Sequence, residues 1–407
     1  MRRFALLVAG LALIAAVTAT VSGCATQAQA RWVIRDLGTL GGKDSGDYLS
    51  GGPVAINERG QIVGSSHTKK GASHAFLWAN GKMRDLGTLG GSDSEAVAIK
   101  EHGHVIGSAD KKNGSAHAFF WQGGKMRDLG TLGGPGSQAV AINERGQVVG
   151  SADTAAKDKD GYPIAHAFFW ENGKMRDLGT FGGQASAATD INASGQVVGW
   201  SGVMRRYANG EPMAHAFLWQ NGTMRDLGVL PGGKESMAVA INDQGQIAAY
   251  SYYTSFEGST PGHNVDYATA FVWQKGRRIL LPKQDSFPRA INERGEVIGE
   301  VYYQGGKQWM DDAGSGNWAQ AFLWATGRQR ILHQGETAWT QDINKAGQVV
   351  GLQYMEGMRA CIWQGNGALV LLPALRGSHD SKAAAINDQA QIVGISGEQA
   401  VLWTLKR

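Results

Sequence analysis

Histidine recurs at one position of a repeated His-Ala-Phe motif, and histidine is a common metal ligand. If the repeats form a ring, equivalent positions are spread around that ring. Metal ligands must instead converge to within about 2 Å of one ion. We therefore expect these histidines to cap neighbouring turns, and we expect no metal site. They are His74, His117, His166 and His215.

An aspartate also recurs, between an arginine and a Leu-Gly pair. Its carboxylate is expected to accept backbone N–H bonds from the glycine-rich segment that follows. The repeated aspartates are Asp36, Asp85, Asp128, Asp177 and Asp226.

Other residues that could do chemistry do not complete a known site. Asp158-Lys159-Asp160-Gly161 begins like a calcium loop, but Ala156 stands where an acid is needed and the later bidentate Glu is missing. Cys361 replaces a Phe of the repeat and is expected to be a buried thiol. No Gly-x-Ser-x-Gly, Walker or His-Glu-x-x-His motif occurs, so we expect no cofactor and identify no catalytic residue.

The elements that position these residues follow from an internal repeat. An isoleucine that closes a short segment, such as Ala-Val-Ala-Ile at residues 139–142, recurs eight times, at intervals of 43 to 52 residues. A tryptophan that closes an apolar run also recurs eight times. The isoleucines are Ile56, Ile99, Ile142, Ile191, Ile241, Ile291, Ile343 and Ile386, and the tryptophans are Trp78, Trp121, Trp170, Trp219, Trp273, Trp324, Trp363 and Trp403.

Each unit is predicted to form four short strands. In the third unit these are residues 139–143, 147–151, 166–170 and 174–178, separated by turns at Gly146 and at Asn172-Gly173. The chain has 59 glycines among 407 residues, which suits many tight turns. A net charge of only +4 and the absence of a basic run give no indication of nucleic-acid binding.

The two ends of the repeat predict a closed ring. Residues 31–38 match the fourth strand of a unit with no unit before them, and the eighth unit stops after its third strand, at residues 403–405. One end therefore completes the other, which removes the unpaired edge that an open solenoid would leave. The sequence predicts an all-β, eight-bladed β-propeller over residues 31–407, closed by an N-terminal strand that completes the C-terminal blade.

The first 30 residues are interpreted as an export signal. Arg2 and Arg3 precede an apolar run at residues 4–17, which is too short to span a membrane. The following Val21-Ser22-Gly23-Cys24 resembles a bacterial lipobox, so residues 1–23 would be a lipoprotein signal peptide, Cys24 would be lipidated and residues 24–30 would form a tether. The alternative is plain secretion, with cleavage after Ala30. We expect a lipid-anchored protein of the cell envelope, periplasmic or at the cell surface.

The repeat resembles the HAF-repeat family of probable extracellular bacterial proteins. The similarity rests on His-Ala-Phe-x-Trp, Asp-Leu-Gly-Thr-Leu-Gly-Gly and Ala-Ile-Asn-x-x-Gly-Gln-Val-Val-Gly, as in residues 166–170 and 141–150. It covers about residues 31–407 and weakens after the fourth unit. The family implies export and a repeat architecture, and it supplies no activity. In the later units the histidine is replaced by Thr269, Gln320, Arg359 and Gln399.

Four consecutive units, the third to the sixth, carry insertions between their second and third strands. The insertions hold eight of the ten tyrosines of the chain. In a propeller these loops share one face with the links between blades, and loops on a rigid scaffold are common binding sites. The candidate ligand contacts are Tyr207, Arg205, Tyr252, Tyr253, Tyr302, Tyr303, Trp309 and Trp318.

The leading hypothesis is a monomeric, membrane-anchored propeller that binds a glycan, peptide or protein through this aromatic-rich face. One alternative is a hydrolase or lyase of the cell envelope built on the same scaffold, and another is a purely structural envelope protein. Propellers host all three kinds of function.

Overall fold

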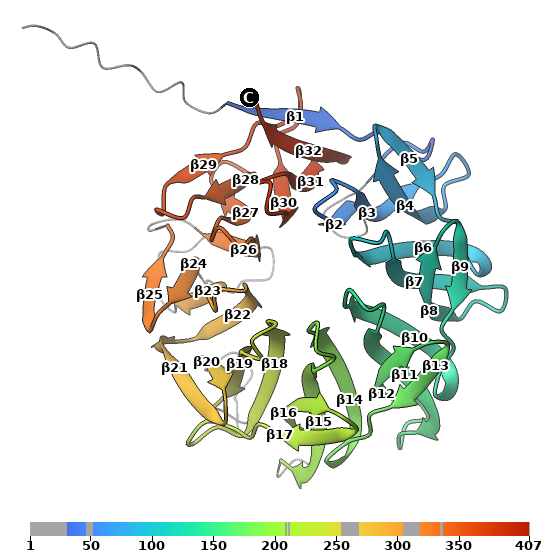
Figure 1. The fold of residues 1–407 in the computed structure, drawn as a ribbon, viewed down its shortest axis with the longest axis vertical. Helices are drawn as coiled ribbons and strands as arrows, with labels where there is room; N and C mark the ends of the chain where they lie inside the picture. Colours follow the sequence, from blue (N-terminus) through green and yellow to red (C-terminus); the bar gives the residue numbers. More distant parts are fainter. Residues whose placement is uncertain are drawn as a thin grey trace, which may run out of the picture.

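The structure is a computed structural model in which eight four-stranded antiparallel sheets form a ring (Figure 1). It describes residues 31–45, 52–207, 210, 212–253, 268–303, 318–333 and 337–406, without the side chains of Pro53, Gln284, Tyr303 and Trp318. All regular structure in these ranges is β-strand. The predicted eight-bladed β-propeller is therefore confirmed. The predictions for the signal peptide, Cys24 and the tether lie outside the described residues.

Blades 1 to 4 each take four consecutive strands, and the fourth strand lies outermost. Blade 1 contains β2 (Gly52–Ile56), β3 (Ile62–His67), β4 (Ser73–Ala79) and β5 (Lys82–Asp85); blade 2 contains β6 (Gly90–Ile99), β7 (Val105–Lys111), β8 (Ala116–Gln122) and β9 (Lys125–Asp128); blade 3 contains β10 (Gly133–Ile142), β11 (Val148–Lys157), β12 (Pro163–Glu171) and β13 (Lys174–Asp177); blade 4 contains β14 (Gly182–Ile191), β15 (Val197–Arg206), β16 (Pro212–Gln220) and β17 (Thr223–Asp226).

Blades 5 to 7 repeat this order, and blade 8 takes three strands from the end of the chain and one from its beginning. Blade 5 contains β18 (Glu235–Ile241), β19 (Ile247–Tyr252), β20 (Ala268–Gln274) and β21 (Arg277–Gln284); blade 6 contains β22 (Ser286–Ile291), β23 (Val297–Tyr303), β24 (Trp318–Ala325) and β25 (Arg328–Ile331); blade 7 contains β26 (Ala338–Ile343), β27 (Val349–Tyr354), β28 (Met358–Trp363) and β29 (Leu369–Leu371); blade 8 contains β30 (Ser381–Ile386), β31 (Ile392–Ser396), β32 (Gln399–Leu405) and β1 (Trp32–Asp36).

Ring closure takes place in blade 8, as the sequence predicted. Strand β1 pairs antiparallel with β32, from Trp32 opposite Leu405 to Asp36 opposite Val401. Figure 1 shows the two strands side by side, in blue and dark red. The pairing covers the outer edge of β32, which would otherwise expose unpaired backbone N–H and C=O groups.

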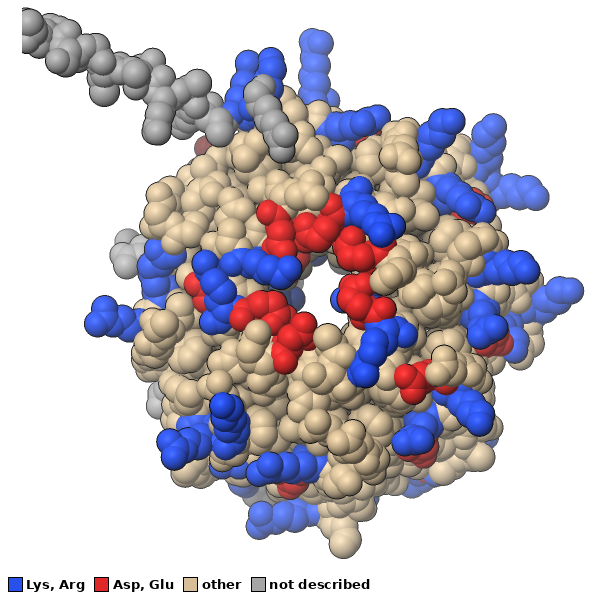
Figure 2. Space-filling view, in the orientation of Figure 1, with Lys and Arg blue, Asp and Glu red and all other residues tan. Residues whose placement is uncertain are grey.

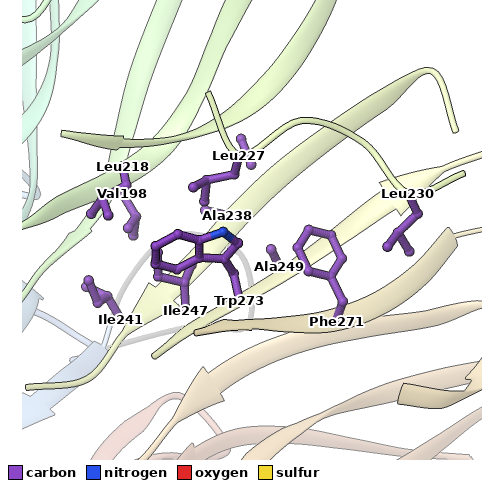
Figure 3. Packing of buried hydrophobic residues seen from close by; sticks show 11 residues of the cluster. Val198, Leu218, Leu227, Leu230, Ala238, Ile241, Ile247, Ala249, Phe271 and Trp273 are labelled. Carbon is purple, nitrogen blue, oxygen red and sulfur yellow. The ribbon is translucent and has the colours of Figure 1, made fainter. Parts of the chain in front are cut away.

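The hydrophobic core is divided into clusters that lie between neighbouring blades. Figure 3 shows the cluster between blades 4 and 5, where Trp273 and Phe271 of β20 pack with Leu218 of β16. Trp273 is 8% exposed and Phe271 is fully buried. The recurring tryptophans are therefore packing residues between blades, as expected from their large apolar surface.

The insertions of blades 3 and 4 lengthen β-hairpins. In blade 3, β11 and β12 stay paired as far as Lys157 opposite Pro163, and in blade 4, β15 and β16 stay paired as far as Arg206 opposite Pro212. The sequence reasoning ended the second strand of unit three at residue 151, whereas β11 runs to Lys157.

The glycine-rich links bring the chain from one blade to the next. The first glycine of each Gly-Gly pair has a positive φ, for example +108° at Gly133. The second lies against the second strand of the blade: a Cβ at Gly134 would come within 2.4 Å of the Thr154 carbonyl oxygen. The first glycine is thus required by its positive φ, and the second by the close approach of the neighbouring strand, which leaves no room for a Cβ.

Candidate functional site

The repeated histidines and aspartates hold the links between blades. His117 Nδ1 lies 2.8 Å from Asp128 Oδ1, and its Nε2 lies 3.2 Å from the Pro135 carbonyl oxygen in the next link. Asp128 also accepts the Gly130 N–H at 2.8 Å. His74, His166 and His215 contact Asp85, Asp177 and Asp226 in the same way, at 2.8 to 2.9 Å. The predicted turn-capping roles are confirmed. These side chains form hydrogen bonds that hold the links between blades in place.

A ring of carboxylates surrounds the axial opening at the turns between first and second strands. Adjacent blades are linked where a backbone N–H donates to a carboxylate of the next turn: Glu58 N to Glu101 at 2.7 Å, and, closing the ring, Asp388 N to Glu58 at 2.9 Å. Figure 2 shows acidic side chains around this opening. The ring consists of Glu58, Glu101, Glu144, Asp243, Glu293 and Asp388.

A ring of asparagines at the start of these turns forms hydrogen bonds within the turn and to the next blade. Asn387 Nδ2 donates to the Asn57 carbonyl oxygen at 3.1 Å, across the closure of the propeller. Its Oδ1 accepts the N–H groups of Gln389 and Gln391 in its own turn. The Ile-Asn motif of the repeat therefore shapes each turn and joins it to the next blade. These two rings lie at the opposite end of the innermost strands from the insertions.

A set of partly exposed aromatic side chains gathers where the insertions of blades 5 and 6 begin. Tyr250 and Tyr252, from β19, lie 5.3 and 6.1 Å from Phe287 of β22 (ring centroids), and Phe287 lies 5.5 Å from Tyr302 of β23. Tyr302 also contacts Trp339 of β26 in blade 7. We call Tyr250, Tyr252, Phe287, Tyr302 and Trp339 the aromatic rim.

Charged groups adjoin the rim at its blade 6 and blade 7 end. Glu300 is 2% exposed and accepts hydrogen bonds from Thr340 N at 2.8 Å and Thr340 Oγ1 at 2.9 Å, with Arg289 Nε at 3.5 Å. Burial raises the pKa of the Glu300 carboxyl, and Arg289 opposes that shift. Burial also raises the pKa of the Tyr302 hydroxyl, and the Glu300 carboxylate adds to this effect. The Tyr302 hydroxyl is therefore neutral at pH 7 and can donate a hydrogen bond.

Lys382 of β30, in blade 8, occupies the repeat position that Phe287 and Trp339 occupy in blades 6 and 7. Burial lowers the pKa of its ammonium group, and Arg289 lowers it further. Arg289 and Lys382 belong to the first strands of blades 6 and 8. Within the described part of the chain, Lys382 forms no ion pair with a carboxylate.

The structure distributes the predicted contact residues unevenly. Tyr252 and Tyr302 meet in the aromatic rim through Phe287. Tyr253 packs instead against the core between blades 4 and 5, so the adjacent Tyr252 and Tyr253 do point to opposite sides. Tyr207 is only 6% exposed, with Lys234 Nζ 5.7 Å from its ring centroid, and is therefore a core residue in this structure.

The remaining predicted contacts do not join the rim within the described residues. Arg205 is exposed near the end of β15 in blade 4. Tyr303 and Trp318 are opposite each other in the backbone ladder of blade 6, but their side chains lie outside the described part. Trp309 also lies outside the described residues.

Sequence reasoning missed Phe287, Trp339, Arg289 and Lys382, because all four lie on first strands and not in insertions. For Phe287, Trp339 and Lys382 the signal was present at the position four residues before the recurring isoleucine. That position is occupied by eight different residues, although its neighbours repeat: Gly52, Glu95, Gln138, Ala187, Met237, Phe287, Trp339 and Lys382.

Two further features bear on chemistry. Cys361 is fully buried and free, as predicted, and burial raises the pKa of its thiol. Among the described residues, no group of three or more His, Cys, Asp or Glu side chains is placed to hold a metal ion. In the same residues no helix is long and apolar enough to cross a membrane.

Comparisons with known proteins identify the fold. No family model matches the sequence, and no curated protein matches it significantly. A puromycin hydrolase S511A mutant complexed with PGG is 12% identical, with a TM-score of 0.51, over 85% of this chain and 58% of the hydrolase. Virginiamycin B lyase from Staphylococcus aureus is 11% identical, with a TM-score of 0.44, over 92% of this chain and 100% of the lyase. The β-propeller domain of the Trilobed protease from Pyrococcus furiosus is 10% identical, with a TM-score of 0.43, over 88% of this chain and 95% of that domain. What this chain shares with these proteins is the β-propeller fold.

Proposed function

We propose that this chain is an exported, lipid-anchored HAF-repeat propeller of the cell envelope that binds a glycan, peptide or protein at the aromatic rim. The observation that carries the proposal is the contact of Tyr252 and Tyr302 through Phe287, across two blades, with each ring partly exposed. Large amphipathic rings on a rigid scaffold provide contact area at low entropic cost. The closed ring of blades supplies that rigidity.

The groups beside the rim favour a ligand that carries an anion. Lys382 is partly buried and has no carboxylate partner in the described residues, and an unpaired cation in such a place is costly. A ligand carboxylate would satisfy it while the body of the ligand covers the rings. The neutral Tyr302 hydroxyl would add a hydrogen-bond donor.

Binding is favoured over catalysis because the carboxylates near the axis are already engaged. Glu300 is buried and accepts two hydrogen bonds from Thr340. Five of the six carboxylates of the axial ring accept a backbone N–H from the adjacent turn at 3.2 Å or less. Groups used in this way hold the scaffold together and are poorly placed to exchange protons with a substrate.

The binding proposal is tested by a glycan and peptide screen of the full chain, followed by titration of the strongest ligand. Tyr252→Ala, Tyr302→Ala and Trp339→Ala should each weaken binding by about 30-fold, the usual effect of a truncated hot-spot aromatic. Lys382→Met should weaken binding of acidic ligands in particular. Tyr162→Ala, at a side chain that is 69% exposed on the blade 3 hairpin, is the matched control and should change nothing.

Two results would contradict the proposal. Unchanged affinity in the rim variants would place the ligand elsewhere. Loss of folding in all of them would mean that the rings serve only to pack blades 5 to 7 together.

The proposed anchor is tested separately. Lipidated protein should partition into detergent, and Cys24→Ala should release the chain or leave it uncleaved. Stable anchoring requires more than one acyl chain, as a lipoprotein carries. A mature N-terminus at Arg31, found by mass spectrometry, would instead show plain secretion.

A further inference from the structure

Neighbouring blades are repeatedly joined by an arginine that lies over a tryptophan. The arginine comes from the outermost strand of one blade and the tryptophan from the third strand of the next. Arg84 lies 5.3 Å from the Trp121 ring centroid, and Arg225 lies 5.3 Å from that of Trp273. At the closure of the propeller, Arg35 of β1 covers Trp78 of blade 1 at 5.0 Å. The stacked arginine fills the groove between the two blades.

Among the described residues five of the eight grooves hold no stacked arginine, and in two of these, where Arg127 and Arg176 keep the position of Arg84, a phenylalanine precedes the tryptophan of the repeat. Phe120 and Phe169 stand where blades 1 and 4 have Leu77 and Leu218. The Phe120 ring lies 5.6 Å from Trp170, and the Phe169 ring lies 5.1 Å from Trp219. In this described region, neither Arg127 nor Arg176 stacks on the tryptophan of the following blade.

The groove between blades 2 and 3 is closed by histidine. His104 packs on Phe120 with centroids 5.1 Å apart, and His102 stacks on His104 at 5.7 Å. Gln122 fixes the position of the His104 ring with a 2.8 Å hydrogen bond.

The groove between blades 3 and 4 stays open. Gln147 occupies the position that His104 has in blade 2. Its Nε2 donates a hydrogen bond to Glu171 Oε1 at 2.6 Å, and it has no ring to pack on Phe169 as the His104 ring packs on Phe120. An open cleft of about 640 Å³ results, with Phe169 and Trp219 at its base. The polar side chains that line it include Arg145, Gln147, Glu171, Lys174 and Arg176.

The charges around this cleft are unbalanced. Arg145, Lys174 and Arg176 are exposed, and no carboxylate of the described residues forms an ion pair with any of them. Glu171, the acid of the lining, is held by Gln147. Three cations therefore face one cleft with a single carboxylate beside them.

We propose that this cleft is a second binding site, which takes a phosphate ester. Arginine side chains present forked N–H groups that match phosphate oxygens, and a phosphate monoester carries nearly two negative charges. The organic part of the ester would lie toward Phe169 and Trp219. The cleft lies among the turns at the opposite end of the blades from the aromatic rim, so this proposal does not depend on the first.

The test is isothermal titration of the full chain in detergent with two probes, inorganic phosphate and dihexanoyl phosphatidic acid. Saturable binding is expected, and Arg176→Ala and Lys174→Ala should each weaken it at least 10-fold. Phe169→Leu should weaken it to a similar extent with no change of charge, because it lets Arg176 lie over Trp219 as Arg84 lies over Trp121. Arg225→Ala, at a closed groove, is the control and should bind like the parent.

The two probes distinguish the source of the phosphate. Tighter binding of the phosphatidic acid would support an ester whose body contacts the base of the cleft, and equal binding would contradict the ester and leave a site for the free anion. Absence of saturable binding to either probe would overturn the proposal, and so would undiminished binding in Phe169→Leu and Arg176→Ala. Melting curves must show that each variant is folded, and Arg145→Gln replaces any variant that is not.

Discussion

Asp190 of blade 4 accepts a hydrogen bond from the backbone N–H of Ile241 in blade 5, at 2.9 Å. Its other carboxylate oxygen accepts the N–H of Ile191, at 2.8 Å. One side chain thus joins the innermost strands of two blades. Asp342 repeats the arrangement between blades 7 and 8, with Ile386 N at 3.0 Å. The other six blades have alanine at this position.

Asp190 should make the stability of the propeller depend on pH. Burial raises the pKa of its carboxyl to about 6, although the two N–H bonds oppose the shift. The folded state therefore holds the proton more tightly than the unfolded state does. Stability associated with this group is complete below about pH 4, the ordinary Asp value, and is lost as the pH rises through about 6.

The variant Asp190→Ala separates this effect from all other titrations. Measured relative to the parent chain, the stability of this variant should be higher at pH 7 than at pH 4, by at most about 3 kcal/mol, because only the parent loses stability as the carboxyl ionises. Urea denaturation at the two pH values measures the difference. The substitution also removes the hydrogen bonds from the Ile191 and Ile241 N–H groups. Their loss lowers stability at both pH values and therefore cancels when the two are compared. An equal effect of the substitution at pH 4 and pH 7 would mean that the carboxyl titrates normally.

Ser137 should contribute to stability by joining blades 2 and 3. Its Oγ accepts the Ala118 N–H at 2.9 Å and donates to the Gly130 carbonyl oxygen at 2.6 Å. Ser137→Ala should lower the free energy of unfolding by about 1–3 kcal/mol, because it leaves a buried N–H without an acceptor.

Ser108 provides the matched control for Ser137. Its buried Oγ has no hydrogen-bond partner among the described residues, so Ser108→Ala should be neutral or slightly stabilising in the same urea experiment. Equal losses in the two variants would show that the hydrogen bonds of Ser137 are not the source of its contribution.

Strand β1 should be needed for a stable, soluble ring. Deleting residues 31–37 removes Trp32 and Leu37 from two core clusters and uncovers the edge of β32. The loss should be at least about 5 kcal/mol, since each large buried side chain contributes about 2–5 kcal/mol. Thermal melting and light scattering should show a lower transition and aggregation.

Deletion of residues 158–161, at the mostly exposed tip of the blade 3 hairpin, serves as the control for the β1 deletion. This variant should melt close to the parent. A β1 deletion that melts like this control would show that the ring does not depend on its closing strand.

Much of the scaffold could be predicted from the sequence because it depends on regular spacing. The repeat set the number of blades, and the two incomplete units predicted the pairing of β1 with β32. The roles of His117 and Asp128 were also predictable, since their partners recur at a constant separation along the chain.

The candidate sites depend on contacts that break the repeat. The aromatic rim joins Tyr252 to Phe287, and the cleft places Arg176 beside Trp219 without stacking; each pair comes from different blades. Sequence periodicity specifies which positions are equivalent in all eight blades, and so it predicts the contacts that every blade makes. Where a single blade carries Phe169 or Lys382, the outcome depends on the size and charge of side chains in the adjoining blade. Only the tertiary structure decides these contacts, because packing and electrostatic interactions act between neighbours in space, whatever their separation along the chain.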